Sequence, residues 1–213
     1  MNILIDRLPE SVAIDGREYQ INWGYRAFLL IEICLFDKRL NDEQKMLNCL
    51  NIFYNRDIPQ NLPAAIERLQ WFYRCGGERG GKKSGGSSRA PRKVIRCYDF
   101  EQDAPYIYSA FFTQYGIDLQ ETGNYDLHWW KFSAMFESLG EELKLSKIMY
   151  YRTAKTSGLD KERRRFLNEM KKLYALQDPE DNTDAKMKLA RRNAQMKEYV
   201  RGRMQEVDNA EKG

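Results

Sequence analysis

The sequence predicts a mainly α fold, in which a helical domain carries a small N-terminal β-hairpin and ends in a charged helical C-terminal tail. Three observations predict this class. Apolar residues recur at helical spacing through most of the 213 residues. The dipeptide Asp15-Gly16 separates two short apolar runs near the start. Beyond residue 159, charged residues dominate and the apolar stripe becomes thin.

The hairpin is expected from residues 12–14 and 19–21. Asp15 and Gly16 between them tolerate the positive φ angles of a type I′ turn, whose twist suits two antiparallel strands. A two-stranded ribbon is only marginally stable alone, so its apolar side chains should pack on the helices that follow.

Three helices are predicted in the first part of the domain, over residues 25–36, 42–54 and 63–74. The first is apolar on almost every side, interrupted by Glu32, and should be buried. Asn41 or Asp42 can cap the second, and Pro63 stands at a first-turn position of the third. Residues 1–75 should therefore form one hairpin-plus-helices segment.

Residues 76–93 differ in kind from the rest of the chain. They hold six of the 14 glycines, and six basic residues against one acidic residue. No core can be built from this composition, so we predict a flexible Gly/Ser/basic loop. The loop could bind nucleic acid, but it lacks the interleaved aromatic residues that stack on bases, which favours a solvated loop.

After the loop, residues 94–176 should form the aromatic-rich helical part of the same domain. The first helix should begin at Asp103, a candidate N-cap, and stop at Gly116. Its predicted apolar face is made of Ala104, Ile107, Tyr108, Phe111, Phe112 and Tyr115. Further helices are expected over 127–139, 145–154 and 159–176. Pro179 breaks the pattern, and 177–213 should hold a charged C-terminal helix over about 184–207.

The composition argues against several classes of function. Lys and Arg number 35 against 31 Asp and Glu, so the net charge of +4 gives no bulk basicity for nucleic acid. One His and four scattered Cys, with no CxxC pair, predict no metal site and no cofactor. No nucleotide-binding or nucleophile-elbow motif occurs, so we expect no catalytic residues and no enzyme. The acids between Tyr98 and Asp103 fit a turn and a helix start better than a calcium loop.

Membrane association is not expected either. Asp6 and Arg7 come before any apolar run of signal-peptide length, and no apolar run is long enough to span a bilayer. We expect a soluble protein of the cytoplasm with reduced thiols.

The string Leu127-His128-Trp129-Trp130-Lys131-Phe132 is the most unusual in the chain. On a helical wheel His128 falls on the same broad face as Trp129 and Phe132, which favours a core histidine bonded to a carbonyl or carboxylate group. Trp130 falls on the opposite side. Either its helix is buried on two sides within one subunit, or Trp130 is an exposed anchor for a partner.

This string and several others together resemble one phage protein family, known as gene product fifteen, over residues 1 to about 176. The matching motifs are Trp71-Phe72-Tyr73-Arg74-Cys75-Gly76, Tyr98-Asp99-Phe100 with Asp103, Gln114-Tyr115-Gly116-Ile117-Asp118-Leu119, and Tyr151-Arg152. The resemblance implies a protein of long-tailed phages and prophages of Gram-positive hosts. It also implies a gene between those for the tail-tube and tape-measure proteins, a position typical of tail assembly chaperones.

The resemblance therefore implies a non-enzymatic chaperone in the host cytoplasm, whose partners are the tape-measure protein, the tail-tube protein and a second copy of the chain. The candidate partner-binding residues are Trp71, Tyr98, His128, Trp129, Trp130, Met196, Val200 and Met204. Two alternatives stay open: a structural virion component, such as a tail-completion or connector protein, and a nucleic-acid-associated protein that uses the basic loop.

Overall fold

A computed structural model describes residues 2–77, 96–121 and 127–177. The chain divides into two compact units, Met1–Tyr174 and Ala175–Gly213, and the helices and strands described below all lie in the first. Almost all of the predicted loop at 76–93 lies outside the described residues. So does the predicted C-terminal helix with Met196, Val200 and Met204.

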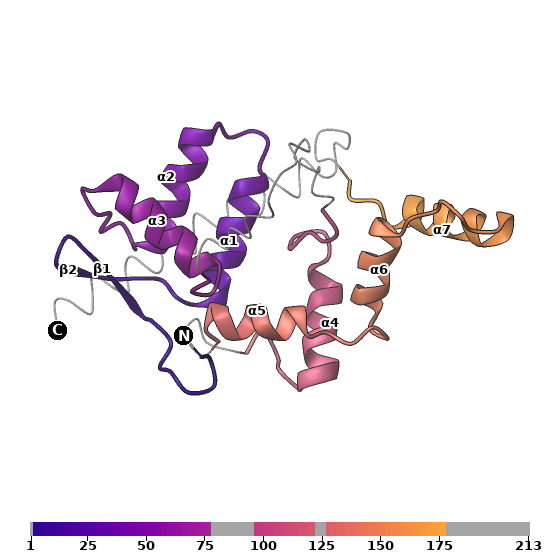
Figure 1. The fold of residues 1–213 in the computed structure, drawn as a ribbon, viewed down its shortest axis with the longest axis horizontal. Helices are drawn as coiled ribbons and strands as arrows, with labels where there is room; N and C mark the ends of the chain where they lie inside the picture. The colour runs from indigo at the N-terminus through magenta and orange to yellow at the C-terminus, as the bar shows by residue number, and fades with distance from the viewer. Residues whose placement is uncertain (1, 78–95, 122–126, 178–213) are drawn as a thin grey trace, which may run out of the picture. The chain divides into compact units, whose positions relative to one another are not determined.

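The predicted fold class is confirmed: the described residues form seven helices and a two-stranded antiparallel hairpin (Figure 1). The hairpin pairs β1 (Ser11–Ile14) with β2 (Arg17–Gln20), and Ile14 lies opposite Arg17. Asp15 and Gly16 have φ angles of 50° and 79°, as a type I′ turn requires. The hairpin is not free-standing, since β1 packs against α3.

Three helices follow the hairpin, close to their predicted bounds: α1 (Tyr25–Phe36), α2 (Asp42–Phe53) and α3 (Leu62–Tyr73). The Asn41 side chain accepts from the backbone N–H of Gln44, whose own side chain accepts from the Asn41 N–H, so a complete capping box starts α2. Pro63 lies in the first turn of α3. As predicted, α1 is largely buried, and it packs against α2 and α5.

Four helices form the rest of the described unit: α4 (Ala104–Tyr115), α5 (Trp129–Glu137), α6 (Lys144–Thr153) and α7 (Lys161–Leu173). Gly116, with a φ of 65°, ends α4 as predicted. The predicted apolar face of α4 is only partly right. Ile107 and Phe111 are buried, but Phe112 is 54% exposed because the helix turns Ala110 inward instead.

The helix predicted over 127–139 is shorter than expected. Leu127 and His128 lie in extended backbone, because Leu127 accepts from the N–H of Tyr25 and the Trp129 N–H donates to Trp23. These bonds tie the start of α5 to the start of α1. The local apolar pattern could not reveal this pairing.

Aromatic stacking joins the α1–α3 group to the later helices. Phe28 on α1 lies 5.2 Å from Phe72 and 5.1 Å from Trp129, ring centre to ring centre. Phe132 on α5 stacks on Tyr25 at 5.1 Å and on Phe111 of α4 at 4.8 Å. Helix α5 therefore lies between the two groups and packs on both, as Figure 1 shows.

A buried ion pair joins the start of α4 to α6. Asp103 takes the predicted N-cap position of α4, but its side chain makes no cap hydrogen bond there. Its carboxylate instead accepts two hydrogen bonds from the Arg152 guanidinium of α6, and one from the backbone N–H of Asp99. Arg152 also donates to the carbonyls of Cys97 and Tyr174. A long-range ion pair has taken the place of the local cap.

Candidate functional site

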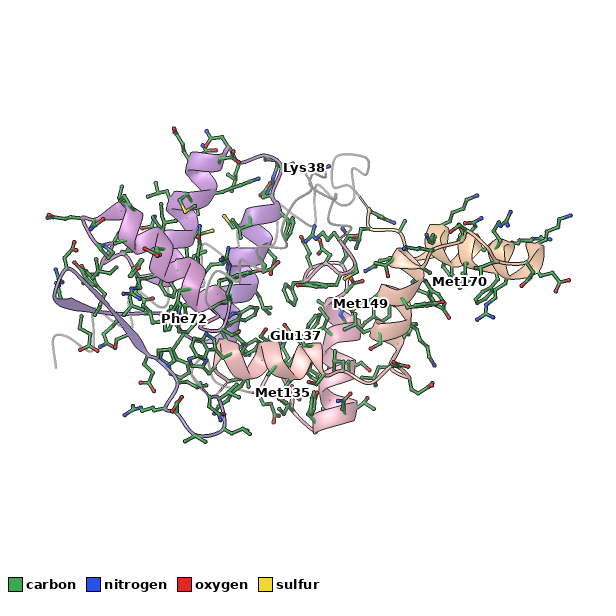
Figure 2. The ribbon with its side chains drawn as sticks, viewed as in Figure 1. Lys38, Phe72, Met135, Glu137, Met149 and Met170 are labelled. Atoms are coloured by element: carbon green, nitrogen blue, oxygen red, sulfur yellow. The ribbon has the colours of Figure 1, made fainter. Side chains whose placement is uncertain are left out.

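An open cleft of about 930 Å³ lies between the two groups of helices. Seven of its seventeen lining residues are aromatic, and the rest are small, aliphatic, polar or charged. The lining comes from the N-terminal turn, from helices α1, α3, α5 and α6 with the residues that follow α3 and α5, and from the segment before α4. The lining residues are Ile3, Glu32, Tyr73, Arg74, Cys75, Tyr98, Phe100, Trp129, Trp130, Phe132, Ser133, Ala134, Phe136, Glu137, Leu139, Ser146 and Met149. Glu137 on α5 and Met149 on α6 can be located in Figure 2. We call this feature the aromatic cleft.

Ring contacts hold the aromatic wall in place. Tyr98 packs on Phe100 and on Phe136, with ring centres 5.0 Å apart in both pairs. Phe100 in turn contacts Phe132 at 6.1 Å. Because Phe132 is fully buried while Tyr98 and Phe136 are only half-buried, the wall runs from the core out to solvent. A rigid apolar surface of this kind can bind without first becoming ordered.

Glu32 brings an acid into this apolar wall. It lies on α1, is 4% exposed, and accepts a hydrogen bond from the Tyr73 hydroxyl of α3. Burial raises the pKa of Glu32, although the Tyr73 hydrogen bond and the positive charge of Arg96 act in the opposite direction. Burial also raises the pKa of Tyr73. The cleft thus contains a carboxyl group whose ionisation is opposed by its surroundings.

The cleft also contains a thiol, that of Cys75. Burial raises the pKa of the Cys75 thiol, which keeps it protonated and a poor nucleophile. Within the described stretches of chain, no cluster of three or more His, Cys, Asp or Glu side chains is placed to hold a metal ion.

His128 has a structural position, as the sequence favoured. Its Nδ1 accepts from the Trp130 N–H at 3.0 Å and so caps α5, while its Nε2 lies 3.1 Å from the Pro9 carbonyl. Donation from Nε2 to Pro9 fixes the neutral tautomer that leaves Nδ1 free to accept. The ring stacks on Trp23 and is 4% exposed.

The two adjacent tryptophans are also core residues. Trp130 is 3% exposed and donates from its indole N–H to the Phe72 carbonyl at 2.8 Å. Trp129 donates in the same way to the Tyr73 carbonyl at 3.1 Å. The pair therefore donates to two carbonyls at the end of α3, and the Phe72 carbonyl also accepts from the Cys75 N–H. The expectation of an exposed anchor at Trp130 is wrong, and the buried alternative holds.

The structure places the predicted partner-binding residues in different surroundings. Tyr98 lines the aromatic cleft, and Trp129 and Trp130 present parts of their rings to it. Trp71 is half-buried against Trp130, at 5.6 Å between ring centres, and does not line the cleft. Sequence reasoning missed Glu32 and Tyr73 as site residues. A signal for Glu32 existed, because it is the one charge within the apolar run of α1.

The fold is therefore mainly helical and contains an open cleft lined in part by aromatic side chains. A family model for the bacteriophage Gp15 protein matches residues 4–176, and the chain therefore belongs to this family of phage structural or morphogenesis proteins. No curated protein and no solved structure matches the chain. No helix within the described residues combines the length and the apolar character that crossing a bilayer requires.

Proposed function

We propose that this protein is a non-enzymatic tail assembly chaperone, which binds apolar helical segments of the tape-measure protein in the host cytoplasm. It would release them as tail-tube subunits polymerise. Family membership supports a role in phage morphogenesis. The finer role rests on the aromatic cleft.

The size and chemistry of the cleft carry the proposal. A volume of about 930 Å³ equals that of about thirty liquid water molecules, more than a single side chain would fill. Its aromatic wall ends at the half-buried side chains of Leu139 and Met149. An amphipathic helix binds such a groove by inserting side chains spaced three and four residues apart. Methionine at the rim adapts to clients of different shape.

Exposed apolar residues extend this surface at the N-terminus. Ile3 lines the cleft, and the adjoining Leu4 and Ile5 are 89% and 80% exposed. Hydrogen bonds from the N–H groups of Ile5 and Asp6 to the Asn2 carbonyl close a turn that holds these side chains outward. Contiguous exposed apolar surface of this kind is typical of a site for another protein.

Co-expression with the tape-measure protein encoded in the same phage tests the proposal. The readout is the fraction of tape-measure protein that stays in solution. Met149→Lys places a charge in the cleft and should abolish the solubilising effect, while Leu47→Lys is the matched control. Leu47 is also an apolar helix residue, 55% exposed on α2, and it does not line the cleft.

Two outcomes would overturn the proposal. One is a tape-measure protein whose solubility does not depend on this chain, or that responds equally to both variants. The other is mass spectrometry of purified particles that finds this protein in abundant, stoichiometric copies in mature tails. That result would identify a virion component instead.

A further inference from the structure

We propose that the aromatic cleft selects apolar helical segments that carry a lysine or arginine, whose cation pairs with the buried carboxylate of Glu32. This inference rests on the proposed function and adds the chemistry of the segment that is bound. It follows from where Glu32 lies, from its partners, and from the rings around it.

Glu32 is costly to the fold where it stands. It occupies a position on α1 that is 4% exposed and faces an aromatic wall, where a leucine or methionine would bury without loss. No Lys, Arg or His of the described residues forms an ion pair with it. The neutral Tyr73 hydroxyl donates a hydrogen bond to one of its two oxygens, Oε1. The carboxyl group therefore keeps capacity to accept a further donor.

The nearest cation is held by other groups. Arg96 lowers the pKa of Glu32 through its charge, but its guanidinium pairs with Asp99 at 2.8 Å. The same guanidinium lies over the Phe36 ring, 3.9 Å from its centre. Arg96 is thus held between Asp99 and Phe36. In the proposed complex, the cation that pairs with Glu32 therefore comes from the bound segment.

The surroundings of Glu32 suit an incoming cation with an apolar stem. Tyr98, Phe100 and Trp129 line the same cleft, and aromatic faces attract ammonium and guanidinium groups. The methylene stem of a lysine or arginine can lie along these rings while its charged end reaches the carboxylate. A second acid, the exposed Glu137, also lines the cleft, as does one basic residue, the exposed Arg74.

The test uses the full chain and three designed helical peptides of about 18 residues, roughly five turns. The peptides share one apolar face and differ at its central position, which is lysine, norleucine or glutamate. Binding is followed by calorimetry. We expect the lysine peptide to bind about tenfold more tightly than the norleucine peptide, as a charged hydrogen bond formed in a buried site would give. The glutamate peptide should bind most weakly.

Glu32→Gln should remove the lysine preference, measured as the ratio of the two dissociation constants within the same protein, because glutamine can still accept the Tyr73 hydrogen bond but carries no charge. Glu67→Gln is the matched control: Glu67 is an exposed acid on α3 that does not line the cleft, so its loss should change the preference by no more than about twofold. Tyr73→Phe is a second variant that keeps Glu32. It removes the hydrogen bond that lowers the pKa of Glu32, so the carboxyl group ionises less readily and the lysine preference should fall.

Equal binding of the lysine and norleucine peptides to the unmodified protein would overturn the charge selection and leave the proposed chaperone function standing. A lysine preference that survives Glu32→Gln would do the same. Failure of all three peptides to bind, together with a tape-measure protein that is insoluble with or without this chain, would overturn both.

Discussion

Replacing Arg152 with alanine should destabilise the protein by about 3–5 kcal/mol, because Asp103 would be left charged and buried without a cation. The side chains of Arg152 and Asp103 are 8% and 2% exposed, so water can neither screen the pair nor take the place of the lost guanidinium. Besides its two bonds to Asp103, Arg152 donates to Cys97 and Tyr174. Its removal therefore breaks four hydrogen bonds, leaves Asp103 with only the bond from the Asp99 N–H, and loosens the contact of α6 with the end of α7.

Urea denaturation, followed by tryptophan fluorescence and far-ultraviolet circular dichroism, measures this loss. A loss of about 4 kcal/mol corresponds to a fall of roughly 8–16 °C in melting temperature for a unit of this size. The double variant Arg152→Met with Asp103→Leu should recover much of the stability, because it removes both charges from the buried site.

Arg165→Ala is the matched control. Arg165 also forms an ion pair with a carboxylate, Glu169, but the two side chains are 83% and 58% exposed. Its removal should change stability by no more than the scatter of the measurement. The reasoning would be refuted if the Arg152 and Arg165 variants lost equal stability, or if the Arg152 variant lost less than about 1 kcal/mol, the usual limit for an exposed pair.

Two further predictions concern α5 and its contacts. Burial lowers the pKa of His128 below its ordinary value, so the unfolded chain takes up a proton first as pH falls. The contribution of His128 to the free energy of unfolding should be full above about pH 6.5, the ordinary pKa that His128 has in the unfolded chain. It should be lost as pH falls through the lower pKa of His128 in the folded state. His128→Asn, which can keep the cap without titrating, should show a smaller difference between urea midpoints at neutral and acid pH; an equal difference would contradict this role. Gly76→Ala should destabilise more than Gly16→Ala. Both glycines have positive φ, but only at Gly76 would the new Cβ meet a neighbour, the Trp130 ring at 2.8 Å. Equal melting temperatures for the two variants would exclude the clash.

The sequence was sufficient wherever the determining interaction is local. The bounds of α1, α2 and α3 follow from apolar spacing, from the capping box of Asn41 and Gln44, and from Pro63. The hairpin follows from the two residues of its turn. In each case the groups that decide the structure lie within about four residues of one another, which is the reach of helix and turn hydrogen bonds.

Prediction failed where a distant partner competed for the same group. Asp103 has the local features of an N-cap, but Arg152, 49 residues later, takes its carboxylate. His128 was expected within a helix and instead ends an extended segment that pairs with the start of α1. Local patterns carry no information on such bonds, because the partner's approach depends on the packing of whole helices.

The sequence by itself determined the helical class, the hairpin and a supply of aromatic residues larger than one helix face could hide. Only the tertiary structure decided which of those rings lie in the core and which line the aromatic cleft. Trp130 is buried and donates to a carbonyl 58 residues away, while Tyr98 is only half-buried in the cleft that Glu32 also lines. The physical reason is that burial belongs to a surface shared by several helices, and such a surface exists only after residues far apart in the chain have packed together.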